Sequence, residues 1–174
     1  MSDGPRFRVH FRRRREGRTD YRVRRKLLQS GRPRAVVRLS ARRVRVSLVD
    51  FDPTGDRVLA MADSGELGGI AFPATSLSST PAAYLTAYLA GLRAKASGTE
   101  AAVLDLGVRR PTAGGRLSAA LKGLLDAGVD IPHGEEGFPT ADRLGGSHLP
   151  KPLPRPLEAY KQQLASLAAR REAA

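Results

Sequence analysis

Four consecutive arginines, Arg12–Arg15, are the residues whose type and spacing most clearly indicate chemistry. Each guanidinium group is planar, stays charged and offers paired N–H donors that fit a phosphate group. Four side chains in direct succession point in several directions from one backbone. The run therefore suits a crevice lined with phosphates better than a flat surface. The alternative is an ordinary solvated basic tail.

The positive charge is concentrated in the first quarter of the chain. Residues 1–45 contain 17 Lys and Arg against 3 Asp and Glu, whereas residues 46–174 contain 13 against 14. Arginine outnumbers lysine 25 to 5, and since arginine both grips phosphates and stacks on bases, the excess favours RNA as the partner. An anionic membrane is the rival, but residues 5–26 carry too few apolar side chains for a helix that lies on a membrane.

Further basic residues extend this candidate surface onto a hairpin and a later loop. The predicted RNA-binding residues are Arg6, Arg8, Arg12, Arg13, Arg14, Arg15, Arg18, Tyr21, Arg22, Arg24, Arg25, Lys26, Arg34, Arg38, Arg42, Arg43, Arg45, Arg109 and Arg110. Arg43 and Arg45 alternate with apolar Val44 and Val46, so they form either a basic sheet face or an ordinary solvated one. For the loop arginines, a phosphate contact and a plain connection are equally open.

Three aromatic residues lie among the charges of the N-terminal region. An aromatic ring stacked on an unpaired base contributes about 1–3 kcal/mol to binding. For Tyr21, base stacking and packing within the protein are equal alternatives. For Phe7 and Phe11, we expect packing that anchors the region to the protein's own core.

Catalysis is the less favoured alternative. A metal-dependent ribonuclease would need clustered carboxylates to hold two metal ions. The candidates are Asp50, Asp52, Asp105, Asp126 and Asp130. Asp50 and Asp105 fall near predicted strand ends. Asp52, in contrast, belongs to a turn, and Asp126 and Asp130 flank a helix end. Cysteine is absent, and the three histidines lie too far apart for zinc-ligand spacing. We therefore predict no enzyme activity, no cofactor and no metal.

The elements that must position these residues alternate between strands and helices. We expect helices at about 19–28, 81–96, 116–127 and 157–171, and strands at 35–39, 44–48, 57–62, 102–106 and 129–131. Residues 64–80 are expected to be loop. Three strands joined by short turns indicate an antiparallel meander. The helices and strands that follow extend it into a mixed sheet with helices packed on it, an α/β (α+β) fold.

Four segments organise the chain. They are a basic RNA-binding arm at 1–33, a globular mixed-sheet domain at 34–134, a linker rich in Pro and Gly at 135–156, and an amphipathic C-terminal helix at 157–174. The charge of the arm predicts disorder until RNA binds. The apolar stripe of the last helix must dock on this domain or on a neighbour. No apolar run is long enough to predict a membrane span.

Several blocks of sequence resemble one known family. They are Gly-Pro-Arg-Phe at 4–7, Arg-Arg-Arg-Arg-Glu-Gly-Arg-Thr-Asp-Tyr at 12–21, Leu-Leu-Gln-Ser-Gly at 27–31, Ala-Tyr-Leu at 83–85, Leu-Ala-Gly-Leu-Arg-Ala at 89–94, Ala-Val-Leu-Asp at 102–105 and Ala-Gly-Val-Asp-Ile-Pro-His at 127–133. In order and type they are similar to the archaeal and eukaryotic branch of the ribosomal protein L-eighteen family, whose eukaryotic members are called L-five. The resemblance spans residues 4–134 and favours an archaeal source.

This resemblance implies a protein of the cytoplasmic ribosome that binds 5S rRNA in the central protuberance of the large subunit. It also implies contacts with large-subunit (23S-type) rRNA and neighbouring ribosomal proteins, with no membrane or small-molecule substrate. The implied fold is a ribonuclease-H-like arrangement. After His133 the chain departs from the longer, often acidic ends expected of relatives. The alternatives are the metal-dependent ribonuclease and a general RNA chaperone whose arm alone is active.

Overall fold

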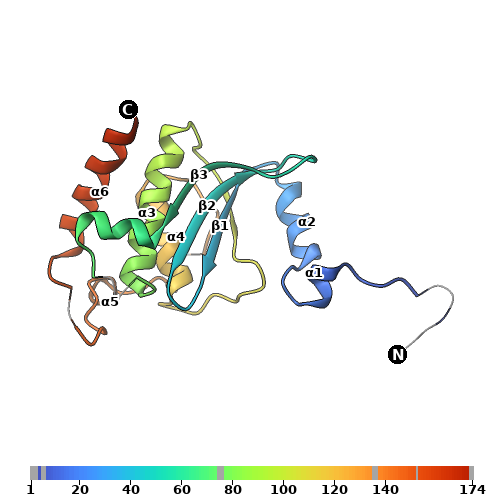
Figure 1. Cartoon of the computed structure of the whole chain (residues 1–174), viewed down its shortest axis with the longest axis horizontal. Coiled ribbons are helices and arrows are strands. Elements are labelled where there is room, and N and C mark those ends of the chain that lie inside the picture. Colours follow the sequence, from blue (N-terminus) through green and yellow to red (C-terminus); the bar gives the residue numbers. More distant parts are fainter. Residues whose placement is uncertain (1–3, 5–6, 74–76, 135–136, 152, 173–174) are drawn as a thin grey trace.

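The computed structural model describes residue 4 and residues 7–73, 77–134, 137–151 and 153–172. Its elements in chain order are α1 (Arg12–Arg15), α2 (Tyr21–Gln29), β1 (Arg34–Leu39), β2 (Val44–Asp50), β3 (Arg57–Asp63), the 3-10 helix η1 (Ser64–Ile70), α3 (Thr80–Ala96), β4 (Val103–Asp105), α4 (Arg116–Asp126), α5 (Ala141–Leu144) and α6 (Leu157–Glu172). Helices α3 and α4 lie on one side of the sheet and α6 lies beyond them. The arm with α2 projects on the β1 side (Figure 1).

The sheet has the strand order β3-β2-β1-β4. Strands β1, β2 and β3 pair antiparallel, whereas β4 runs parallel to β1. A turn joins β2 to β3, in which Asp52 accepts hydrogen bonds from the backbone N–H and the hydroxyl of Thr54 at 2.8 and 2.7 Å. The predicted meander and the mixed α/β class are therefore confirmed.

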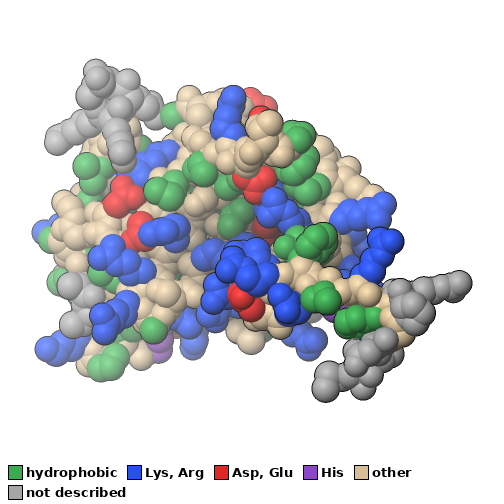
Figure 2. Space-filling model, turned by 45° about the vertical axis from the view of Figure 1, so that its right-hand side comes forward, with side chains coloured by type: hydrophobic (Ala, Val, Ile, Leu, Met, Phe, Trp, Pro, Cys, Tyr) green, Lys and Arg blue, Asp and Glu red, His purple; other side chains and the backbone are tan. Residues whose placement is uncertain are grey.

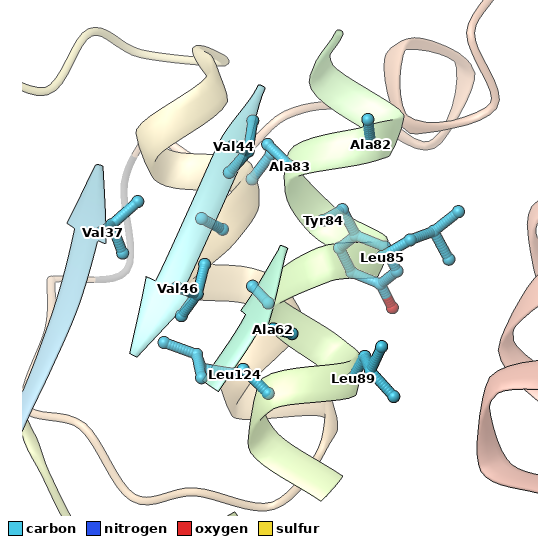
Figure 3. Close-up of a cluster of buried hydrophobic side chains, with 14 of the residues drawn as sticks. Val37, Val44, Val46, Ala62, Ala82, Ala83, Tyr84, Leu85, Leu89 and Leu124 are labelled. Atoms are coloured by element: carbon cyan, nitrogen blue, oxygen red, sulfur yellow. The ribbon is translucent and has the colours of Figure 1, made fainter. Parts of the chain in front are cut away.

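The core lies between this sheet and helix α3. Val44, Val46 and Leu48 alternate along β2 with more accessible residues and are fully buried. The side chains of Val44 and Val46 point toward α3 (Figure 3). Helices α3 and α4 approach so closely that a Cβ atom on Gly123 would lie 2.3 Å from the carbonyl oxygen of Tyr84. Only glycine permits this spacing, because a Cβ atom would force the two helices apart.

The structure differs from the sequence-based elements at 64–70 and 129–131, and it forms the short helix α1, which was not predicted. Residues 64–70, predicted as loop, form η1, which a capping box of Asp63 and Glu66 stabilises at its start. The predicted strand at 129–131 is reduced to one parallel bridge between Ala101 and Asp130. Helix and strand patterns were both too short here for periodicity to distinguish them.

The C-terminal part of the chain packs on the domain itself. Tyr160 and Leu164 of α6 are fully buried, and the ring of Tyr160 meets that of Phe72 edge-on at 5.4 Å. The expected extended linker contains α5, whose Leu144 also joins the core. The boundaries of the four predicted segments stay a prediction, but 135–156 is not wholly extended. No helix in the described ranges is long and apolar enough to cross a membrane.

Candidate nucleic-acid interface

Helix α2 carries five of the predicted RNA-binding residues, more than any other described helix or strand. It begins at Asp20, whose carboxylate accepts hydrogen bonds from the N–H groups of Arg22 and Val23 at 2.9 and 3.2 Å. It ends at Ser30 and Gly31, where a positive φ of 63° suits glycine. None of its residues is buried. Local capping rather than a core contact therefore accounts for its ends.

Five charged side chains join α2 to the sheet in an alternating row. Arg24 of α2 donates to both oxygens of Asp56 at 3.0 and 3.2 Å, and Arg34 of β1 donates to the same carboxylate. Arg34 also donates to Asp105 of β4 at 2.9 Å. Arg38 of β1 donates to the second oxygen of Asp105 at 3.1 Å. We call this row Arg24–Asp56–Arg34–Asp105–Arg38 the charge ladder.

Asp105 is the most enclosed carboxylate of the charge ladder. Burial alone would raise its pKa, but the charge of Arg38, the N–H of Gly107 and the guanidinium of Arg34 outweigh burial and hold the pKa below the usual 3.8. Asp105 is thus an ionised partner for the arginines of β1. The sequence offered one signal for this role, because a lone aspartate in a buried strand requires a cation or donors.

Arg34 does not fit the prediction that it contacts RNA. Its side chain is only 4% exposed and lies between the carboxylates of Asp56 and Asp105. Arg24 and Arg38 are more accessible, at 36% and 48%, yet each also points into the charge ladder. Sequence reasoning missed Asp56. Its neighbours in the chain indicate only a turn, and its two partners lie 22 and 32 residues away.

Two other groups of predicted residues are partly neutralised. Arg12 and Arg18 lie 3.9 and 3.1 Å from Glu16. Arg43 and Arg45 lie 3.0 and 3.3 Å from Asp63. The pKa of Asp63 is lowered; burial acts to raise it but is outweighed by the N–H of Gly65 and by both arginines. A purely basic sheet face is therefore not what the structure presents, although both arginines stay exposed.

The remaining predicted basic residues point to solvent. Exposed, and without a carboxylate within ion-pair distance in the described part of the chain, are Arg8, Arg14, Arg15, Arg22, Arg25, Lys26, Arg42, Arg109 and Arg110. Arg13 donates to the hydroxyl of Thr19 at 2.9 Å. Arg6 lies outside the described residues. With the arm side turned forward, Lys and Arg side chains form patches across this face, and fewer Asp and Glu side chains lie among them (Figure 2).

A groove of about 340 Å³ brings the arm and the loop after β4 together. Its lining includes Arg14, Tyr21, Arg22 and Val108, and the exposed loop residue Arg109 directly follows. The groove thus combines cations with an aromatic ring. This combination suits a nucleic-acid strand, whose phosphates attract cations and whose bases stack on rings.

The aromatic residues of the arm do not anchor it to the core. Phe7 is 55% and Phe11 73% exposed, so the expectation of core packing for both was wrong. Phe11 contacts only the ring of Tyr21 among the described aromatic residues, at a centroid distance of 5.4 Å and a tilt of 49°. The two rings together leave an aromatic surface open between arginines.

The carboxylates weighed for a nuclease lie in separate interactions. Besides Asp105 in the charge ladder, Asp126 accepts a hydrogen bond from the hydroxyl of Tyr84 at 2.6 Å. Asp130 lies 3.8 Å from Arg32. Asp50 accepts from the N–H of the next residue at 2.9 Å. Within the described ranges, no three His, Asp or Glu residues are grouped so that they could hold a metal ion.

Together these features define a class: a small α+β protein with an arginine-rich arm, a form typical of RNA-binding proteins. The model of the family described as "Ribosomal large subunit proteins 60S L5, and 50S L18" matches residues 5–99. The chain belongs to this family. That membership confirms the resemblance seen in the sequence and makes the chain a structural ribosomal protein rather than an enzyme.

Individual relatives extend the match towards the C-terminus. The chain is 48% identical over 149 residues to large ribosomal subunit protein uL18 of Methanoregula boonei, covering 86% of this chain and 85% of that protein. It is 49% identical over 149 residues to uL18 of Korarchaeum cryptofilum, covering 86% and 76%. It is 44% identical over 169 residues to uL18 of Methanococcoides burtonii, covering 94% and 97%. The expectation that relatives are longer after His133 is therefore wrong for the last of these, which the match covers almost completely.

Proposed function

We propose that this chain binds 5S rRNA and attaches it to large-subunit rRNA in the central protuberance of the cytoplasmic ribosome, beside neighbouring large-subunit proteins. The observation that supports the proposal most directly is the set of exposed arm cations that lack a carboxylate partner among the described residues. Such cations are free to neutralise phosphates, and the counterions released from the RNA favour binding.

The groove between α2 and the loop after β4 supports recognition beyond simple charge. Arg14 and Arg22 offer donors to phosphates, while Tyr21 and its neighbour Phe11 offer rings to unpaired bases. Phosphate contacts set the position of an RNA, and base contacts distinguish one RNA from another. A surface with both kinds of group suits an RNA of defined shape, such as 5S rRNA.

The general RNA chaperone is the second candidate. It would need only a flexible polycation, and the high charge of the arm is its sole support. The charge ladder favours the first proposal, because it ties α2 to a folded domain that a chaperone would not require.

The test compares affinity for 5S rRNA and for transfer RNA at about physiological salt, using the full chain. We expect a clear preference for 5S rRNA. Replacing Arg12–Arg15 with glutamine should weaken binding and reduce the slope of log affinity against log salt by about 3, since each phosphate that is no longer neutralised lowers it by roughly 0.7–0.9. Thermal stability should not change, because no residue of α1 is buried.

A matched variant separates charge from geometry. Replacing the same four arginines with lysine keeps every charge, so the salt slope should stay, while the absence of paired donors weakens binding in part. Equal affinity of the unaltered chain for both RNAs would support the chaperone instead.

A further inference from the structure

Helix α2 makes few apolar contacts with the domain, and the charge ladder joins the two. Within α2, Leu27 and Leu28 are half-buried and Val23 is 43% exposed. A polar cavity of about 90 Å³ remains beneath the helix, lined among others by Arg24, Leu27 and Asp105. The helix is therefore not seated by close apolar packing. The ion pair that joins it to the domain runs from Arg24 to Asp56.

Exposure falls steadily along the charge ladder towards its centre. The Arg24 side chain is 36% exposed and Asp56 is 28% exposed, whereas Arg34 and Asp105 are 4% and 8% exposed. Solvent and salt screen ion pairs less as they become buried. The inner pairs are thus stable supports, and Asp56 links them to α2, because both of its oxygens accept from one guanidinium nitrogen of Arg24.

The same contacts decide which cations of α2 face outward. Arg24 turns inward to Asp56, while Arg22, Arg25 and Lys26 are exposed. Residues on the helix face opposite Arg24 are presented to solvent because Arg24 is fixed. Four cations on nine residues would otherwise repel one another and favour an extended chain.

We propose that Asp56 and Asp105 are positioning residues for RNA binding, which hold α2 on the sheet before RNA arrives and so preset the outward cations. The RNA part of this inference rests on the proposed function. The composition of the arm predicted disorder until RNA binds. For α2 the inference is the opposite, since carboxylates of the domain order this helix rather than RNA phosphates. Arg24, Arg34 and Arg38 act through these carboxylates and not as phosphate ligands.

The decisive variant is Asp56→Asn, because charge and position predict opposite results. Removing a negative charge next to the arm should by itself strengthen RNA binding. If Asp56 positions α2, the variant binds 5S rRNA about ten-fold more weakly, since a smaller fraction of molecules holds the competent arrangement. The salt slope should stay the same, because the substitution leaves every phosphate-binding cation in place.

Asp52→Asn is the matched control. Asp52 lies in the same turn region and accepts its hydrogen bonds from Thr54, outside the charge ladder. Asparagine preserves that turn, since its side-chain oxygen also accepts such bonds. This variant removes the same charge and should bind RNA equally well or slightly more tightly. Equal binding by the Asp52→Asn and Asp56→Asn variants would overturn the proposal.

A measurement without RNA tests whether Asp56 holds α2 on the sheet. In the full chain, amide hydrogen exchange should show protection of Arg24 to Gln29, and Asp56→Asn should remove it while α3 stays protected. Unprotected α2 amides in the unaltered chain would sink the inference. Failure of the chain to prefer 5S rRNA, with this pattern intact, would instead refute only the proposed function.

A milder variant covers the case in which Asp56→Asn also unfolds α3. Arg24→Lys keeps the charge and leaves Arg34 with both carboxylates, but it replaces a rigid planar guanidinium with a flexible, strongly hydrated ammonium that holds Asp56 less firmly. We expect weaker protection of α2 and several-fold weaker binding to 5S rRNA. Unchanged protection and affinity in this variant would contradict the positioning role.

Discussion

Helices α2 and α3 are held in the same molecule by different interactions. Helix α3 buries twelve of its 17 residues and packs on the sheet and on α4. Helix α2 buries none of its nine, and ion pairs link it to Asp56 and thence to the sheet. Apolar packing excludes water and is not screened by salt, whereas exposed ion pairs weaken as salt rises.

The two helices show how one small chain combines a stable body with an exposed set of cations, which the proposed function assigns to RNA. The core elements can be fixed without charge, so the cations are left for phosphates. The arm needs its cations exposed, so apolar burial is not available to it. The charge ladder lies between the two regions: its inner members are buried like the core, and its outer member Arg24 belongs to the arm.

The largest expected effect is a loss of stability when a buried side chain of the core is truncated. Tyr160→Ala removes a fully buried ring between α6 and Phe72. We expect a decrease of about 3–5 kcal/mol in the free energy of unfolding, the range for truncating a large buried ring. RNA affinity of the folded fraction should not change. Chemical denaturation and an RNA titration well below the unfolding midpoint measure both.

A matched variant sharpens this test. The hydroxyl of Tyr160 is buried with no hydrogen-bond partner among the described residues. Tyr160→Phe should therefore be neutral or slightly stabilising, because it removes a polar group that burial leaves unsatisfied. If phenylalanine destabilises as much as alanine does, the ring contact is not what holds α6.

A substitution in the arm should have the opposite pattern: weaker RNA binding with nearly unchanged stability. The effect should also be smaller. Tyr21→Ala should weaken 5S rRNA binding by about 1–3 kcal/mol if a base stacks on the exposed pair that Tyr21 forms with Phe11. Unfolding stability should stay nearly constant, since Tyr21 is only half-buried. Met61→Ala, on an exposed apolar residue of β3, is the control and should leave both quantities unchanged. Lower stability in Tyr21→Ala without weaker binding would assign the ring to packing.

Much of the core could be predicted from the sequence because its signals are local. The alternation of Val44, Val46 and Leu48 indicated a half-buried strand, and Thr80–Pro81 indicated the start of α3, both as the structure has them. The basic arm and its family resemblance also followed from residues adjacent in the chain. Predictions were least secure where a segment was short, as at η1 and the bridge at Asp130.

The charge ladder could not be predicted in the same way. Its contacts join residues up to 71 positions apart, and no periodic pattern marks a charge that will meet another in space. Arg34 therefore looked like one more RNA ligand among its basic neighbours. Phe11 was misjudged for a related reason: hydrophobicity predicts burial on average, but a ring in a charged arm has no core within reach.

The smallest expected effect is a loss of stability at acid pH. It tests the charge ladder, which lies between the arm and the core. The pKa of Asp105 in the folded chain lies below its ordinary value of 3.8, since Arg38, Gly107 and Arg34 together outweigh the effect of burial. A lowered folded pKa means that the stabilisation is fully present above the ordinary value and is lost as pH falls through the folded pKa. The contribution of Asp105 to the melting temperature should thus stay constant from pH 7 to about 5 and should decrease only below about pH 4.

Comparing Asp105→Asn with the unaltered chain isolates that contribution. The variant should be less stable at pH 7, yet its melting temperature should drop less between pH 7 and pH 3. An equal drop in both proteins would assign acid sensitivity to other carboxylates. Because Asp105 supports α2 through Arg34 and Asp56, acid should also expose the amides of α2 at a pH where those of α3 remain protected. Loss of protection at the same pH in both helices would mean that arm and core unfold as one unit and are not held separately.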